Sequence, residues 1–162
     1  MAAVTGSSAA VVTLPEDTQI LITREFSAPR PLVYRAFTEP DLVRRWWAGD
    51  HGEVTSIEAD LREGGRWRYV MTAHGGFEVA FNGEYRELVP GERIVRTEIF
   101  EGMPDAGAVS TATFADHGAG TMVTILVQHT SKQNRDAHLN SGMEEGMNES
   151  LAQLDQVARS LA

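Results

Sequence analysis

A run of short alternating segments between residues 53 and 130 constrains the fold more than any other feature of this sequence. Apolar and polar residues alternate along each segment, as on a strand with one buried face, and glycine-containing turns separate most of the segments. The segments read EVTSIEADL, RWRYVMTA, FEVAFNGEYRELV, RIVRTEIF, AVSTATFA and TMVTILVQHT. Because short connections favour antiparallel neighbours, the pattern predicts about six consecutive antiparallel strands.

Helical patterns flank this run on both sides. After an expected strand at residues 18–28, the stretches PRPLVYRAF and TEPDLVRRWWA predict two short helices. From residue 141 to residue 161, a period of about 3.6 residues gathers apolar side chains on one helix face. That face contains Met143, Met147, Ser150, Leu151, Leu154, Val157, Ala158 and Leu161. The order of elements predicts an α+β domain, in which a curved antiparallel sheet of about seven strands surrounds a long C-terminal helix.

This single domain is expected to cover residues 18–162, after a flexible N-terminal extension at residues 1–17 that is rich in Ala, Ser, Val and Thr. Two glycines, Gly142 and Gly146, lie in the first turns of the C-terminal helix. Each would weaken an exposed helix by about 1 kcal/mol relative to alanine. Since glycine lets two backbones approach closely, we expect these turns to pack tightly against a neighbouring element. Gly142 could also mark a break before the helix.

Charge and composition exclude several classes of function. A formal net charge of −9 and a sequence pI of about 5.0 disfavour nucleic acid and anionic membrane surfaces as partners. No stretch approaches the roughly 20 apolar residues of a membrane-spanning helix, so no membrane insertion is expected. The sequence has no cysteine and no phosphate-binding or dinucleotide motif, and we expect neither a metal nor a cofactor. With no signal-peptide pattern at its start, it fits a cytoplasmic protein.

Four stretches occur in an order that resembles a known family. They are ITREFSAPRPLVYRAFTEPDLVRRWWA, GGRWRYVM, GEYRELVPGERIV and SGMEEGMNESLAQLD. The chain is similar, over residues 18–161, to the bacterial proteins grouped with the C-terminal domain of the activator of the heat-shock protein 90 ATPase. That group belongs to the START-like (SRPBCC), birch-pollen-allergen-like superfamily. The resemblance implies a helix-grip fold with a cavity between sheet and helix. It also implies binding of hydrophobic small molecules or lipids, or a cyclase, dehydratase or hydrolase activity.

Aromatic and methionine residues are the main candidates for a binding site. Methionine adapts its shape to an apolar ligand, and tyrosine or tryptophan adds a polar tip to an apolar ring. The expected ligand-binding residues are Trp46, Trp47, Trp67, Tyr69, Met71, Phe81, Tyr85, Thr97, His129, Met143 and Met147. A packed core without a pocket is the alternative explanation for the apolar members of this set.

His129 is the candidate for acid–base catalysis. It ends the segment 121–130 with the same parity as the apolar residues expected to face inward, so it would lie at the rim of the cavity. A structural hydrogen bond at a strand end is the alternative. Glu98 has the opposite parity to Val95 and Ile99, so burial of those two residues would leave Glu98 in solvent.

These features lead us to expect a protein that binds a small hydrophobic molecule between the sheet and the C-terminal helix. Two alternatives stay open: an enzyme that uses the same cavity, and a chaperone-related module that acts through its surface. The expected partner is a small hydrophobic molecule, and a homodimer is an open alternative for the assembly.

Overall fold

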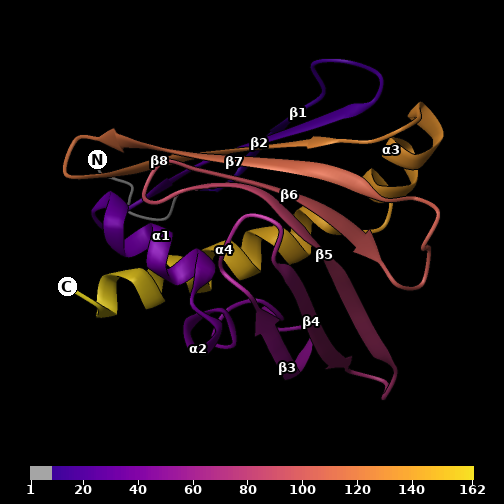
Figure 1. Ribbon diagram of the computed structural model, residues 1–162, viewed down its shortest axis with the longest axis horizontal. Coiled ribbons are helices and arrows are strands. Elements are labelled where there is room, and N and C mark those ends of the chain that lie inside the picture. Colours follow the sequence, from indigo (N-terminus) through magenta and orange to yellow (C-terminus); the bar gives the residue numbers. More distant parts are fainter. Residues whose placement is uncertain (1–8) are drawn as a thin grey trace.

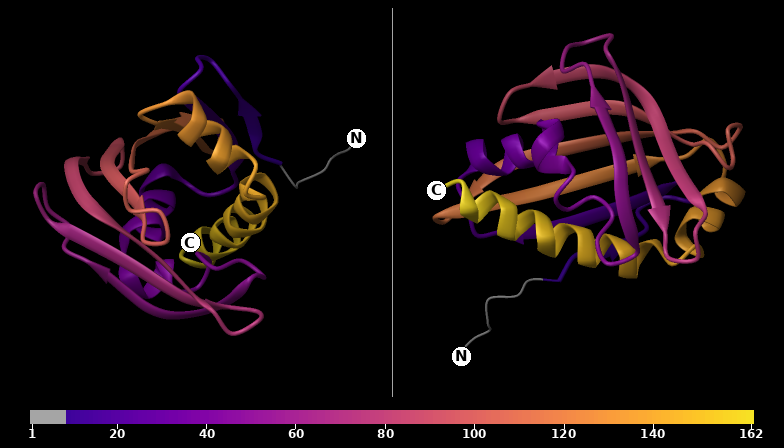
Figure 2. Two further views of the ribbon diagram at one scale, coloured as in Figure 1. Left: turned by 90° about the vertical axis from the view of Figure 1, so that its right-hand side faces the viewer. Right: turned by 90° about the horizontal axis from the view of Figure 1, so that it is seen from below.

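Eight strands of residues 9–162, the part of the chain that the computed structural model describes, form one antiparallel sheet in the order β1-β2-β8-β7-β6-β5-β4-β3 (Figure 1). The strands are β1 (Val11–Thr13), β2 (Gln19–Phe26), β3 (Gly52–Ala59), β4 (Arg66–Ala73), β5 (Glu78–Val89), β6 (Arg93–Phe100), β7 (Ala108–His117) and β8 (Gly120–Gln128). The helices are α1 (Arg30–Thr38), α2 (Pro40–Val43), α3 (Lys132–Leu139) and α4 (Met143–Ser160). The predicted α+β helix-grip architecture is confirmed, because the sheet curves around α4 (Figure 2).

Strand β1 adds one strand to the expected set. It pairs with the outer side of β2, with Val12 opposite Ile22. Just before it, the backbone amide of Ala10 donates a 2.9 Å hydrogen bond to Asn148 Oδ1 on α4. Residues 9–17 therefore belong in part to the sheet, whereas residues 1–8 of the expected extension lie outside the described residues.

Helix α4 occupies the concave side of the sheet. Its buried apolar residues are Leu151, Leu154, Val157 and Ala158, all on the face that the sequence period predicted. Asp155 belongs to the polar side of that pattern but is also buried, because its Oδ1 accepts a 2.8 Å hydrogen bond from the backbone amide of Ser27. In the described part of the chain, no helix combines the length and the hydropathy needed to cross a bilayer.

An aromatic cluster around α1 closes one end of the interior. The ring of Phe37 lies 6.3 Å from that of Phe26, 5.7 Å from that of Trp46 and 5.2 Å from that of Phe114. Trp46 is only 7 % exposed, and its indole Nε1 donates a 2.8 Å hydrogen bond to the carbonyl of Ala36. Trp46 therefore lies in a packed part of the core.

We expected close packing to require the two glycines at the start of α4, but the structure does not show such packing at either one. Gly142 adopts a left-handed conformation with φ of 83° immediately before the helix, and a Cβ there would meet nothing within 4 Å. Its expected role as a break before the helix is confirmed, since this conformation favours glycine. At Gly146 a Cβ would lie 3.5 Å from the His51 ring, an ordinary contact that alanine could make. The close-packing explanation is therefore wrong at both positions.

Candidate functional site

A largely enclosed cavity of about 70 Å³ lies on the concave face of the sheet, next to the last residues of α1. It is lined by Phe37, Thr38, Tyr85, Ile94, Arg96, Glu98, Ser110, Ala112 and Ile125. The strand register brings these side chains together, because Arg96 on β6 lies opposite Tyr85 on β5 and opposite Ser110 on β7. The lining thus combines an apolar majority with a few polar groups, as small-molecule sites do.

Arg96 is the cation of this lining, and 19 % of its side chain remains exposed. Its Nη1 donates to the Tyr69 hydroxyl and its Nη2 to Glu98 Oε2, each over 3.2 Å. The guanidinium carbon also lies 3.8 Å from the ring centroid of Trp67, in a cation–π arrangement. Because a guanidinium carries five N–H donors, these contacts leave Arg96 able to donate to a further acceptor.

Tyr85 provides a neutral donor beside Arg96. The residue is almost completely buried. Burial, with the neighbouring Tyr69 as the second cause, raises the pKa of Tyr85. The hydroxyl therefore keeps its proton at neutral pH and can donate a hydrogen bond inside the cavity.

Arg96 and Glu98 were not among the expected site residues, because β6 carries apolar residues on both faces. Burial of the face with Ile99 would have left Glu98 in solvent, but Ile94 shares the other face with the two charged residues and lines the cavity with them. The sequence contained one indication that this face of β6 could be buried: Arg96 and Glu98 are opposite charges two residues apart on a central strand. Such a pair lies on one face and can be buried together.

Thr97 consequently points away from the cavity, on the opposite side of β6. Its Oγ1 accepts a 2.8 Å hydrogen bond from the backbone amide of Glu84. Its carbonyl accepts a 3.1 Å bond from Trp67 Nε1. Thr97 therefore supports the sheet and does not join the other expected site residues.

Four of the expected residues form a continuous aromatic wall, which we define as Trp47, Trp67, Tyr69 and Phe81. The Trp47 ring lies 5.4 Å from that of Tyr69 and 5.8 Å from that of Phe81, in edge-to-face geometry. The rings of Trp67 and Tyr69 are 4.7 Å apart. The wall joins the cavity through Arg96, which contacts Trp67 and Tyr69.

The remaining expected residues surround this wall or lie elsewhere. Met143 and Met147, in the first turns of α4, are half-buried against the core. Met71 on β4 is half-buried and pairs across the sheet with Val79. Trp46 belongs to the packed end of the interior, as described above, and so is separated from its neighbour Trp47.

His129 is buried at the end of β8, beside α3. Its Nε2 lies 3.0 Å from Nδ1 of His138, and its backbone amide donates to the carbonyl of Thr18. Its own Nδ1 is buried and has no hydrogen-bond partner among the described residues. Burial, and then the proximity of His138, lowers the pKa of His129; burial also lowers the pKa of His138, against the opposing effect of Glu98.

The histidine pair predicts a loss of stability at mildly acidic pH. Both folded-state pKa values are lowered, so the unfolded chain, with histidine pKa values of about 6.5, takes up protons first as the pH falls. The free energy of unfolding should be highest above that value and should decrease as the pH falls from about 7.5 to 5.5. Urea titrations at several pH values should show a smaller decrease for the variant His129→Gln/His138→Gln.

A matched control is His74→Gln, since His74 lies at the exposed β4–β5 turn and bonds to a backbone carbonyl. It should leave the pH dependence unchanged. An equal pH dependence in the double variant and in the unmodified protein would contradict the assignment.

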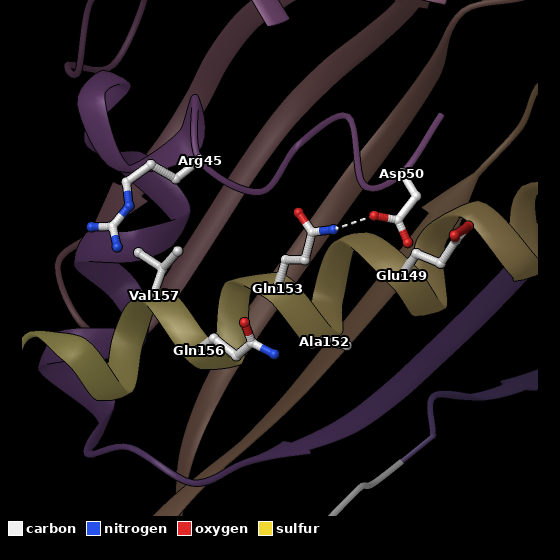
Figure 3. A pocket seen from close by; sticks show the side chains of 7 residues that line it. All are labelled: Arg45, Asp50, Glu149, Ala152, Gln153, Gln156 and Val157. Carbon is white, nitrogen blue, oxygen red and sulfur yellow. Dashed lines mark hydrogen bonds between the residues drawn. The ribbon is translucent and has the colours of Figure 1, made fainter. Parts of the chain in front are cut away.

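A second hollow, of about 490 Å³, follows the seam between α4 and the segment after α2 (Figure 3). Its lining residues are Arg45, Asp50, Glu149, Ala152, Gln153, Gln156 and Val157. Gln153 Nε2 donates a 3.0 Å hydrogen bond to Asp50 Oδ1 across the seam. The hollow is mainly polar and open to solvent, so it differs in character from the enclosed cavity.

A curved antiparallel sheet around a C-terminal helix defines a helix-grip domain, and the enclosed cavity lies between the sheet and the end of α1, with no residue of α4 in its lining. Residues 27–159 match the family described as Activator of Hsp90 ATPase homolog 1-like protein, and the chain belongs to this family. The resemblance inferred from the sequence is thereby confirmed. No curated protein matches the chain.

Solved bacterial structures share the fold. A protein from Rhodobacter sphaeroides is 22 % identical, with a TM-score of 0.87 over 93 % of this chain and 99 % of that one. Protein Ms6760 from Mycobacterium smegmatis is 25 % identical, with a TM-score of 0.82 over 91 % and 96 % of the two chains. Protein CV1439 from Chromobacterium violaceum is 31 % identical, with a TM-score of 0.74 over 88 % and 98 %.

Proposed function

We propose that this domain binds a small, mainly apolar molecule between the sheet and α4, with one polar group of the ligand placed at Arg96. The observation that carries the proposal is the Arg96–Glu98 ion pair inside the cavity, next to the aromatic wall. An ion pair that is largely buried gains little stability over apolar residues of the same size, because both charges lose much of their hydration. Its presence is better explained by a ligand group that it recognises.

The cavity must enlarge to hold such a ligand. Its volume of about 70 Å³ suits a few water molecules, whereas pockets for drug-sized ligands reach about 300–1,000 Å³. Met143 and Met147 are half-buried against the core and can repack, since methionine has three rotatable side-chain bonds. The apolar part of the ligand would then contact the aromatic wall.

The two alternative functions receive less support. Acid–base catalysis depends on His129, whose Nε2 is occupied by His138 and which is absent from the described residues lining the cavity. A chaperone-related role would follow from the family name alone, and a fold does not carry function by itself.

Two fluorescent probes with the same apolar body test the proposal: neutral N-phenyl-1-naphthylamine and its anionic sulfonated analogue, 8-anilino-1-naphthalenesulfonate. Both should give saturable one-to-one binding to the folded protein. The substitution Arg96→Met should weaken the affinity for the sulfonate probe by about tenfold or more, which corresponds to the loss of one charged hydrogen bond. The same substitution should change the affinity of the neutral probe much less.

The control is Arg68→Met. Arg68 lies on the opposite face of the sheet, where it forms a bidentate pair with Glu101. Probe binding should be unaffected by its removal. Equal effects of the two substitutions, or binding that does not saturate, would count against the proposed site.

A further inference from the structure

We infer that residues 44–51, which we call the Trp47 flap, form the entrance to this site and must lift away from α4 to admit a ligand. This inference rests on the proposed binding function. It follows from three features of the flap: what Trp47 covers, how the flap is fixed, and the open hollow that runs beside it.

Trp47 covers the inner face of the sheet. Its ring meets Tyr69 and Phe81 edge to face, so the indole itself completes the aromatic wall. On the helix side, the carbonyl of Trp47 accepts a 3.0 Å hydrogen bond from Ser150 Oγ on α4. Moving Trp47 outward would therefore expose Tyr69 and Phe81 and leave the strand ladder intact.

A few polar contacts fix the flap to α4. Besides the Ser150 bond, Gln153 bonds to Asp50 over 3.0 Å, and His51 Nε2 lies 2.6 Å from Glu149 Oε2. Half-exposed contacts of this kind are individually weak, so they can be broken by thermal motion within a folded protein.

The two ends of the flap are anchored more firmly. Trp46, within the flap, is held in the packed core and by its bond to Ala36. At the other end, the backbone amide of His74 donates to the carbonyl of His51, and His74 Nε2 lies 2.7 Å from the carbonyl of Asp50. The middle of the flap can therefore move while both ends stay in place.

An open hollow lies along the seam. This polar hollow of about 490 Å³ is lined by Arg45 and Asp50 of the flap and by residues of α4 (Figure 3). A route through the sheet would separate hydrogen-bonded strands, such as β4 and β5, and a route past α1 would pull that helix out of the aromatic cluster. Opening along the seam loses fewer hydrogen bonds and less buried apolar area than either route.

An engineered disulfide between the flap and α4, which we call the lock, tests this inference. Because the chain has no cysteine of its own, two introduced cysteines can pair only with each other. Gly49 has a left-handed φ of 57°, so a cysteine there carries some backbone strain in both redox states, but its Cβ would lie 3.3 Å from Glu149 Cβ, close to the roughly 3.5–4.5 Å that a disulfide spans. In the variant Gly49→Cys/Glu149→Cys, the disulfide should slow association of N-phenyl-1-naphthylamine by about tenfold or more in stopped-flow experiments. Reduction of the same sample should restore fast association.

A second variant tests the opposite direction without a new covalent bond. Ser150→Ala/Gln153→Ala removes two of the three contacts and should speed association several-fold in a protein that remains folded. Equal association rates in the oxidised and reduced lock, with an unchanged rate in the alanine variant, would contradict the inference that the flap is the entrance. They would leave the proposed binding function intact. Absence of saturable probe binding by the unmodified protein would instead overturn the proposed function, and the flap with it.

Discussion

Replacing Trp46 by alanine is expected to lower the free energy of unfolding by about 3–5 kcal/mol, the usual range for a large aromatic side chain removed from a core. Trp46 is 7 % exposed, packs against Phe37 and bonds to the carbonyl of Ala36. The substitution leaves a cavity and a buried carbonyl without its donor. Equilibrium unfolding in urea, followed by far-UV circular dichroism, measures the loss.

The adjacent residue provides a matched control. Trp47 is half-buried and belongs to the aromatic wall, so Trp47→Ala should lower the free energy of unfolding by roughly half as much as Trp46→Ala, or less. The same variant should bind N-phenyl-1-naphthylamine with a faster association rate than the unmodified protein, because the indole that covers Tyr69 and Phe81 is gone. Equal losses of stability in the two variants would show that the structure assigns these neighbouring tryptophans to the wrong environments.

Arg96→Met is expected to give the second large effect, a loss of about 2–3 kcal/mol in the free energy of unfolding. The substitution leaves the Glu98 carboxylate in the cavity without its cation, and also removes the bond to the Tyr69 hydroxyl. The loss should lie below the range for fully buried pairs, because 27 % of the Glu98 side chain is exposed and can be hydrated. Thermal and urea unfolding at neutral pH measure it.

A double-mutant cycle separates the ion pair from the remaining contacts of Arg96. Arg96→Met/Glu98→Gln should recover part of the lost stability, because the unpaired charge is then removed. Arg96→Lys keeps the charge and provides a folded variant if Arg96→Met unfolds. A double variant no more stable than Arg96→Met would indicate that Glu98 is hydrated rather than paired.

Much of the fold could be predicted because alternation and helical period are local properties. The expected strands at 66–73 and 93–100 coincide with β4 and β6, and the C-terminal period identified the buried face of α4. Strand β1 could not be predicted in this way. It has three residues, and its stability comes from pairing with β2 and not from its own pattern.

The site was less accessible to sequence reasoning. Trp67 and Tyr69 were placed on one face by their spacing, and the structure brings them together with Trp47 and Phe81. Trp46 and Trp47 could not be distinguished, because adjacent residues of a turn have no fixed faces. On β6, either face could have been the buried one, and only the tertiary position of the strand decides that Arg96 points inward.

The pairing of β2, near the start of the chain, with β8, far along it, has a consequence for synthesis on the ribosome. β2 finds its partner in β8, and the bond from Gln19 to Gln128 spans 109 positions of sequence. The contacts of Ser27 with Asp155 and of Ala10 with Asn148 span 128 and 138 positions. Strand β2 therefore emerges early and lacks its partner β8 until residue 128 has been translated. Folding of this domain should be slow and prone to aggregation whenever translation stops before α4.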